Sequence, residues 1–145
     1  MLITDTSIDW KLAHQIVLAS AEYAESNQLK VCVSVLDKHG NPLAQLRIND
    51  AALPCTAISQ DKAYTAVSFG FPTANWEHRL SAKPHLLSSL AHQPRIVTFG
   101  GGIPLFVNDE VVGAIGISGA SEREDMACAE AGLKRFNDLV ASVQR

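Results

Sequence analysis

Glycines are concentrated in one short part of this 145-residue chain. Six of the nine lie between Gly100 and Gly119, at the start of one apolar run and inside the next. A glycine inside a strand costs about 0.5–1 kcal/mol of stability relative to alanine. The concentration therefore indicates that something approaches the backbone closely, either a ligand or a packed helix. Gly101 and Gly102 stand before the first run, and Gly116 lies inside the second.

Segment 111–118 has one face made of small residues, because side chains alternate along a strand. Ala114, Gly116 and Ser118 share that face. Two interpretations stay open: a helix that packs closely on the sheet, or the floor of a flat ligand pocket. Neither a G-x-G-x-x-G nor a phosphate-loop sequence occurs, so no nucleotide fingerprint is present.

Charged residues occur at two places where they could meet a ligand. Lys62 lies among small residues of a predicted helix, where it is either a solvated surface charge or a cation that binds a carboxylate. Gly119 precedes a helix start, a position that could bind an anion through free amides. Glu122, Glu124 and Asp125 would repel that anion, so they are predicted to complement the helix dipole.

The histidines and cysteines form no strong metal or nucleophile pattern. Three histidines are seven residues apart, which on one helix means a rise of about 10.5 Å, too far for a single metal ion. A haem needs only one axial histidine, so each of the five remains a candidate besides being a surface residue. The histidines are His14, His39, His78, His85 and His92, and the cysteines, predicted to be buried and reduced, are Cys32, Cys55 and Cys128.

Composition limits the class of protein. With 47% hydrophobic residues, the chain is predicted to form a single domain over residues 1–145. A net charge of −3 argues against a nucleic-acid partner, which prefers a basic surface. No apolar run is long enough to span a membrane, and the first residues do not resemble a signal peptide. We therefore expect a cytoplasmic protein.

The elements that position these residues follow from hydrophobic spacing and turn residues. Hairpins without βαβ crossovers favour a mixed α/β (α+β) fold with one antiparallel sheet of about five strands. Helices are predicted over 8–27 behind an Asp9 N-cap, over 57–68, near 73–80 and 84–92, and behind a capping box of Ser121 and Glu124; strands are predicted over 31–37, 42–48, 95–99, 105–107 and 111–118.

Pieces spread over nearly the whole chain resemble the GlcG/HbpS-like family. The resemblance implies a profilin-like fold, with a central antiparallel sheet and flanking helices. The chain departs from the family at Asn108-Asp109-Glu110, where the family tends to place Asp-Gly in a turn. The matching pieces are residues 33–37 with Gly40, Arg47, residues 62–66, 100–104 and 112–119, and Asp125 with Ala129.

The resemblance implies a cytoplasmic accessory protein that binds haem, another tetrapyrrole or a small carboxylated ligand, and that forms a tetramer or octamer. Lys62 or Arg47 would then pair with haem propionates. One alternative is a non-catalytic partner of a diol- or glycerol-dehydratase-type system, and another is an enzyme acting on a small organic acid through Lys62, Thr65 or Asp125. The residues predicted to bind the ligand are Arg47, Lys62, Thr65, Gly101, Gly102, Gly116, Ser118, Gly119 and Asp125.

Overall fold

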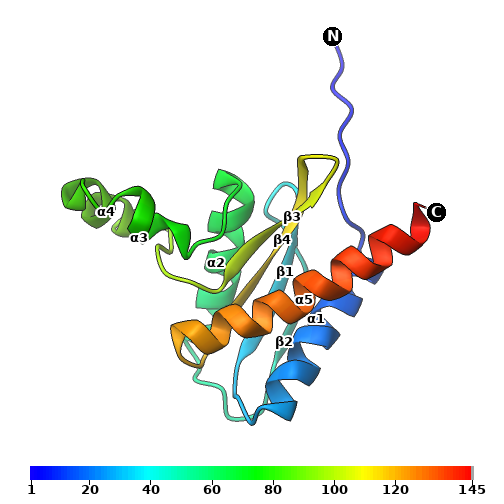
Figure 1. Ribbon diagram of the computed structural model, residues 1–145, viewed down its shortest axis with the longest axis horizontal. Helices are drawn as coiled ribbons and strands as arrows, with labels where there is room; N and C mark the ends of the chain where they lie inside the picture. Colours follow the sequence, from blue (N-terminus) through cyan, green and yellow to red (C-terminus); the bar gives the residue numbers. More distant parts are fainter. Residues whose placement is uncertain (145) are drawn as a thin grey trace.

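A computed structural model describes residues 1–144 as a four-stranded antiparallel sheet with helices on both faces (Figure 1). The strand order is β2-β1-β4-β3, and every neighbouring pair is antiparallel. The strands are β1 (Cys32–Asp37), β2 (Pro42–Arg47), β3 (Gly102–Val107) and β4 (Glu110–Ser118). The helices are α1 (Trp10–Ser26), α2 (Cys55–Phe69), α3 (Asn75–Arg79), α4 (Pro84–Ala91) and α5 (Glu122–Val143).

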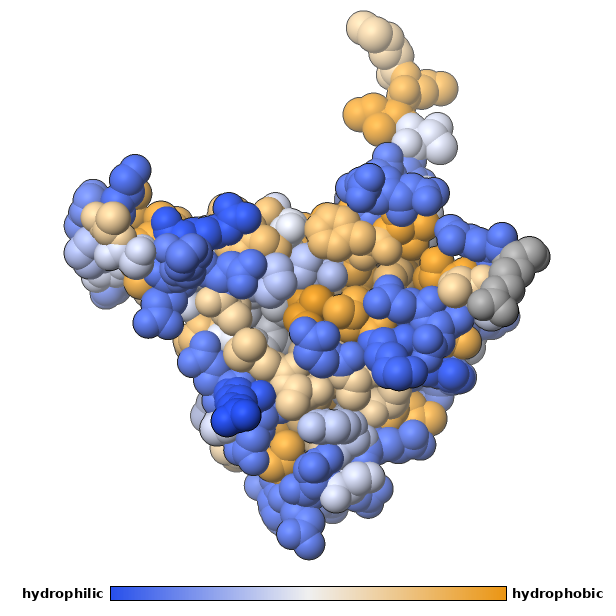
Figure 2. Space-filling view, viewed as in Figure 1, coloured by the Kyte–Doolittle hydropathy of each residue, from blue (hydrophilic) through white to orange (hydrophobic). Residues whose placement is uncertain are grey.

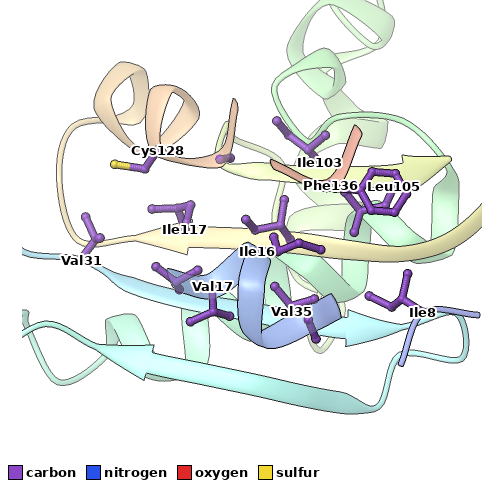
Figure 3. Packing of buried hydrophobic residues seen from close by; sticks show 14 of the residues in the cluster. Ile8, Ile16, Val17, Val31, Val35, Ile103, Leu105, Ile117, Cys128 and Phe136 are labelled. Carbon is purple, nitrogen blue, oxygen red and sulfur yellow. The ribbon is translucent and has the colours of Figure 1, made fainter. Parts of the chain in front are cut away.

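The main hydrophobic core lies between the sheet and the helices α1 and α5 (Figure 3). Ile16 and Val17 of α1 and Phe136 of α5 pack against strand residues such as Val35 and Ile117. Both covering helices have the N-caps expected from the sequence. Asp9 accepts a hydrogen bond from the Leu12 amide at 2.9 Å, and the capping box of Ser121 and Glu124 is formed.

Helix α2 covers the opposite face of the sheet at very short distance. Gly116 of β4 lies directly under it, and a Cβ atom there would come within 2.7 Å of the Ala63 amide nitrogen and would also meet the Ser59 carbonyl oxygen. Leu36, Ala63 and Ala114 pack together beside this contact. The small-residue face of β4 is therefore covered by a closely packed helix, which is one of the two interpretations left open by the sequence.

The sheet has four strands, so the expectation of about five is wrong. Segment 95–99 is the one that does not join the sheet. Its first residue, Arg95, has a φ of +66°, and the Val97 amide donates to the Thr65 hydroxyl instead of to a neighbouring strand. The segment is therefore a loop held by the side chains of α2. Strand β3 begins at Gly102, earlier than predicted.

All three cysteines are buried and free, as predicted. Helix α3 ends at Arg79 and α4 begins at Pro84, so the histidines at 78, 85 and 92 do not share one helix. Within residues 1–144, no helix combines the length and the hydropathy needed to cross a lipid bilayer. A cytoplasmic location remains an expectation.

The turn between β3 and β4 suggests a stabilising substitution. Asn108 and Asp109 have φ values of +50° and +66°, the conformation of a two-residue type I′ turn. Glycine adopts this conformation without the steric penalty of a side chain. We expect Asp109→Gly to raise the free energy of unfolding by about 0.5 kcal/mol, which is the steric relief less the conformational entropy that glycine loses on folding, as measured by denaturant titration.

Asp109→Ala is the matched control, because it also removes the carboxylate but keeps a Cβ atom. It should lower the stability or leave it unchanged. Equal stabilisation by both variants would show that the carboxylate, rather than the backbone conformation, is unfavourable there.

Candidate functional site

A buried ion pair connects α2 with α5. Lys62 is fully buried, and its Nζ donates to Asp125 Oδ2 at 2.9 Å and to the Ile117 carbonyl oxygen at 2.8 Å. Asp125 is 3% exposed, and its Oδ1 accepts the Ala120 amide at 2.9 Å. The pair therefore joins the middle of α2, the end of β4 and the first turn of α5. Removing either partner would leave an uncompensated charge in the interior.

The electrostatics of the site reflect this burial. Burial raises the pKa of the Asp125 carboxyl above its ordinary value, although the Lys62 charge and the amides of Ala120 and Gly119 act in the opposite direction. Burial also raises the pKa of the nearby Cys128 thiol to about 11, and the negative charge of Asp125 contributes. Cys128 is therefore a protonated thiol at neutral pH and is not an activated nucleophile.

The glycine-rich segment packs directly on Lys62. Gly101 has a φ of +127°, and a Cβ atom there would lie 2.8 Å from Lys62 Nζ and 2.6 Å from the Ile117 carbonyl oxygen. At Gly102 a Cβ atom would meet the Lys62 carbonyl group, and the Gly102 amide donates to the Thr73 hydroxyl at 2.9 Å. Because Gly101 and Gly102 have no side chains, the backbone of β4 and α2 and the side chain of Lys62 can pack directly against them.

Segment 95–100 covers the ammonium group from outside. The Phe99 ring, which is about half exposed, has its centroid 4.8 Å from Lys62 Nζ, within the range of a cation–π contact. Thr65 holds one end of the segment, because its hydroxyl lies 2.9 Å from the Arg95 carbonyl oxygen and accepts the Val97 amide at 3.0 Å. At the other end, the Gly100 amide donates to Glu122 Oε1 at 2.8 Å.

The structure brings together most of the predicted ligand-binding residues but not all of them. Arg47 is not at the ion pair, because its guanidinium donates to the Ala51 carbonyl oxygen near the end of the edge strand β2. Gly116 is covered by α2, and Ser118 is a buried residue that pairs with Cys32 of β1. The residues that lie around the ion pair are Lys62, Thr65, Gly101, Gly102, Gly119 and Asp125.

The solvated-charge interpretation of Lys62 is wrong, and the carboxylate that it binds belongs to the same chain. A haem propionate does not fit beside its ammonium group, because Phe99, Gly101 and the protein interior surround it. Asp125 complements the helix dipole and also binds Lys62, a partner that the sequence did not indicate.

All five histidines are exposed. His39 Nε2 lies 3.2 Å from Asp5 Oδ2, and His92 Nδ1 lies 2.7 Å from the Ser88 carbonyl oxygen. In the part of the chain that the structure describes, no three histidine, cysteine or acidic side chains are placed to hold one metal ion. A single axial bond to haem iron remains open to each histidine.

The sequence from residue 8 to residue 134 matches a family model described as "Haem degrading protein HbpS-like". The chain belongs to the HbpS-like family. The resemblance found in the sequence is thereby confirmed. Over 84% of this HbpS-like chain, the sequence is 37% identical to the "uncharacterized 15.0 kDa protein in dhaT-dhaS intergenic region" of Citrobacter freundii, of which 88% is covered.

A second relative is a much longer protein. The HbpS-like chain is 32% identical over 92% of its length to the corrinoid adenosyltransferase PduO of Salmonella typhimurium. It spans only 40% of PduO.

Solved structures share the fold of this HbpS-like protein. The protein ORFY of Klebsiella pneumoniae superimposes with a TM-score of 0.87 at 31% identity, and the match covers 94% of each chain. A PduOC:heme complex superimposes with a TM-score of 0.81 at 32% identity, covering 91% of this chain and 96% of the other.

Sequence reasoning missed three contacts of the site in this HbpS-like protein, one of them made by Glu122, which it assigned to the helix dipole. Phe99 covers the ammonium group, Glu122 fastens the covering segment, and Thr73 fixes the Gly102 amide. One signal for the burial of Lys62 was present in α2. Small residues at positions 59, 63 and 66 recur at helical spacing around Lys62, and such a stripe marks a packed face.

Proposed function

We propose that this HbpS-like protein binds haem, or a closely related tetrapyrrole, as a non-catalytic accessory protein in the cytoplasm, and that it works as a homo-oligomer, a tetramer or octamer. The observation that carries the proposal is the PduOC:heme complex. That protein has the same fold over 91% of this chain and is 32% identical to it.

The side chains of this chain fit an axial contact at the surface better than a buried haem pocket. All five histidines are accessible to a ligand, whereas the interior beside Lys62 is filled by the protein itself. His92 offers a particular advantage, because a bond from Nδ1–H to the Ser88 carbonyl oxygen would leave Nε2 free for iron. Bound haem would supply an iron centre and a visible absorption band.

The test is a haem titration followed in the Soret region, with the wild type and five single His→Ala variants. We expect a saturable shift for the wild type. One of the variants His14→Ala, His39→Ala, His78→Ala, His85→Ala or His92→Ala should weaken binding by at least about tenfold, because it removes the axial nitrogen from the iron.

A non-saturable titration of the wild type would overturn the haem proposal. Saturable binding that all five variants retain would leave haem binding in place and refute the histidine ligand. Because every substituted side chain is exposed, unchanged thermal unfolding serves as the control for folding.

A second candidate function is that of a partner for a diol- or glycerol-dehydratase-type enzyme system. It is favoured by the relative from the dhaT-dhaS intergenic region and by the relationship to PduO. Retention of a dehydratase or its reactivation factor on the immobilised protein, independent of added haem, would support this function.

A third candidate, an enzyme acting on a small organic acid, has the least support. Lys62, Thr65 and Asp125 would be its catalytic residues. Lys62 and Thr65 are fully buried, and segment 95–100 covers the ion pair. Absence of turnover in a metabolite screen is the expected result.

A further inference from the structure

The chain has a projecting helical arm, residues 78–92, that the haem proposal does not use. The arm contains α4 and leads away from the sheet beside α2 (Figure 1). None of the residues of α4 is buried. In the space-filling view the arm stands apart from the body, with apolar and hydrophilic surface side by side (Figure 2).

One face of α4 is apolar and lies outside the hydrophobic core formed by the residues that the structure describes. Leu86, Leu87 and Leu90 are spaced to lie on one side of the helix, away from His85 and His92. Leu86 is 40% exposed, and none of the three leucines belongs to the described hydrophobic clusters or packs against them. An amphipathic helix with this pattern is suited to lie in an apolar groove.

A groove lined by apolar side chains lies between α1 and β2. Leu18, Leu46 and Ile48 line it, and Glu22 and Glu25 are also at its surface. It comprises two adjoining hollows of about 330 and 500 Å³ that share Glu25, Ile48 and Asn49. The groove is thus apolar inside and carries carboxylates.

The charges of the two surfaces are complementary. Residues 78–92 include Lys83 and Arg79 but no aspartate or glutamate. Glu77 precedes them, however, and the Arg79 guanidinium lies 3.8 Å from the centroid of the Phe71 ring. Two cationic side chains also border the groove. Lys30 lies 3.7 Å from Asp50, whereas Arg47 donates to the neutral Ala51 carbonyl oxygen and keeps its charge, so among the described residues two glutamates face one unpaired cation. Glu22 and Glu25 form no salt bridge with the residues that the structure describes, so their charges remain available to a basic partner.

The arm and the groove of one molecule lie at opposite sides of the fold. The arm precedes β3, which is one edge strand of the sheet, and the groove borders β2, which is the other edge strand. In Figure 1, α4 lies at the upper left of the view and β2 near its lower middle. Contact between the arm and the groove would therefore need a second molecule.

We propose that α4 of one copy docks its leucine face in the α1–β2 groove of a second copy, with Lys83 and Arg79 near Glu22 and Glu25. Because the two surfaces differ, the contact is heterologous unless a twofold axis lets two copies exchange arms. A closed assembly would cover every arm. This contact is independent of haem binding, and it supplies an interface for the proposed homo-oligomer.

The test measures the mass of the full chain by sedimentation velocity at about 20 µM protein and low salt, where charge pairs are little screened. The arm variant is Leu86→Ser with Leu90→Ser, and the groove variant is Glu22→Lys with Glu25→Lys. We expect the wild type to be oligomeric, each variant to self-associate at least tenfold more weakly, and a mixture of the two variants to form a dimer. In the mixture, the groove variant still has an intact arm and the arm variant still has an intact groove, so one arm–groove contact can form.

The control is Glu110→Lys with Glu130→Lys, which changes the charge equally at exposed residues outside the groove. It should assemble as the wild type does. A monomeric wild type, a groove variant that assembles normally, or a mixture that stays monomeric would each overturn the proposal. Weakening of wild-type assembly by added salt checks the charge component without any substitution.

Discussion

Replacing Lys62 by methionine is expected to lower the free energy of unfolding by about 3–5 kcal/mol, because it leaves the buried Asp125 carboxylate without its counter-charge. Methionine has a similar length, so little cavity volume is created. Asp125 would keep the Ala120 amide as a partner but would lose the lysine bond at 2.9 Å. Urea or guanidinium titration of both proteins measures the difference.

The double variant Lys62→Met with Asp125→Asn is the matched control. The asparagine keeps an oxygen for the Ala120 amide and carries no charge, so the interior of the double variant is neutral. Neutral replacements of buried ion pairs often cost little. We expect the double variant to be more stable than Lys62→Met alone. If it is less stable, the loss is one of packing and the buried-charge argument fails.

The stability lost in Lys62→Met should also depend on pH. Burial already raises the pKa of Asp125 in the wild type, and removal of the ammonium group raises it further. A carboxyl whose pKa is higher in the folded state than in the unfolded state binds more protons when folded, so its contribution to stability improves as the pH falls. The difference between Lys62→Met and the wild type should therefore shrink at acidic pH.

Local features of the sequence were sufficient to predict most of the elements. The caps at Asp9 and Ser121 use side chains three residues or fewer from the amides that they bond, so the sequence alone shows them. The turn residues between the strands likewise show from the sequence alone where the two hairpins turn. The prediction of a fifth strand was wrong because it rested on the strand-like composition of segment 95–99. The hydrogen bonds of this segment are instead made with Thr65, about thirty residues away in the sequence.

The ion pair could not be predicted because its partners are 63 residues apart. Helical spacing places Lys62 on the small-residue face of α2, and the first turn of α5 explains an acidic residue at Asp125 without any partner. Only the packing of α2 across β4 brings the two together. The glycines were recognised as places of close approach, but the sequence did not show that a helix and a lysine, rather than a ligand, make the approach.

Two neighbouring contacts that hold α2 on the sheet differ in kind. Lys62 fastens the helix to the end of β4 and the start of α5 through hydrogen bonds. Gly116 allows the helix backbone to lie at van der Waals distance from β4. The first contact depends on charge and pH, and the second depends only on volume, so substitutions at the two sites should respond differently to pH.

Replacing Gly116 by valine is expected to lower the free energy of unfolding by about 3 kcal/mol, at the upper end of the usual cost of overpacking. The added Cβ atom would meet the backbone of α2 at Ser59 and Ala63, which cannot rotate away as a flexible side chain would. Denaturant titration at several pH values measures the loss, which should not vary with pH because no charge changes.

Glu110→Val is the matched control, because it places the same side chain in the same strand at an exposed position. Its effect should stay within about 0.5 kcal/mol, as is usual for surface substitutions. If Gly116→Val is as stable as this control, α2 does not press on β4 at this point. The small-residue face of β4 would then have room for a ligand, and the interpretation of Ala114, Gly116 and Ser118 as the floor of a ligand pocket would be supported.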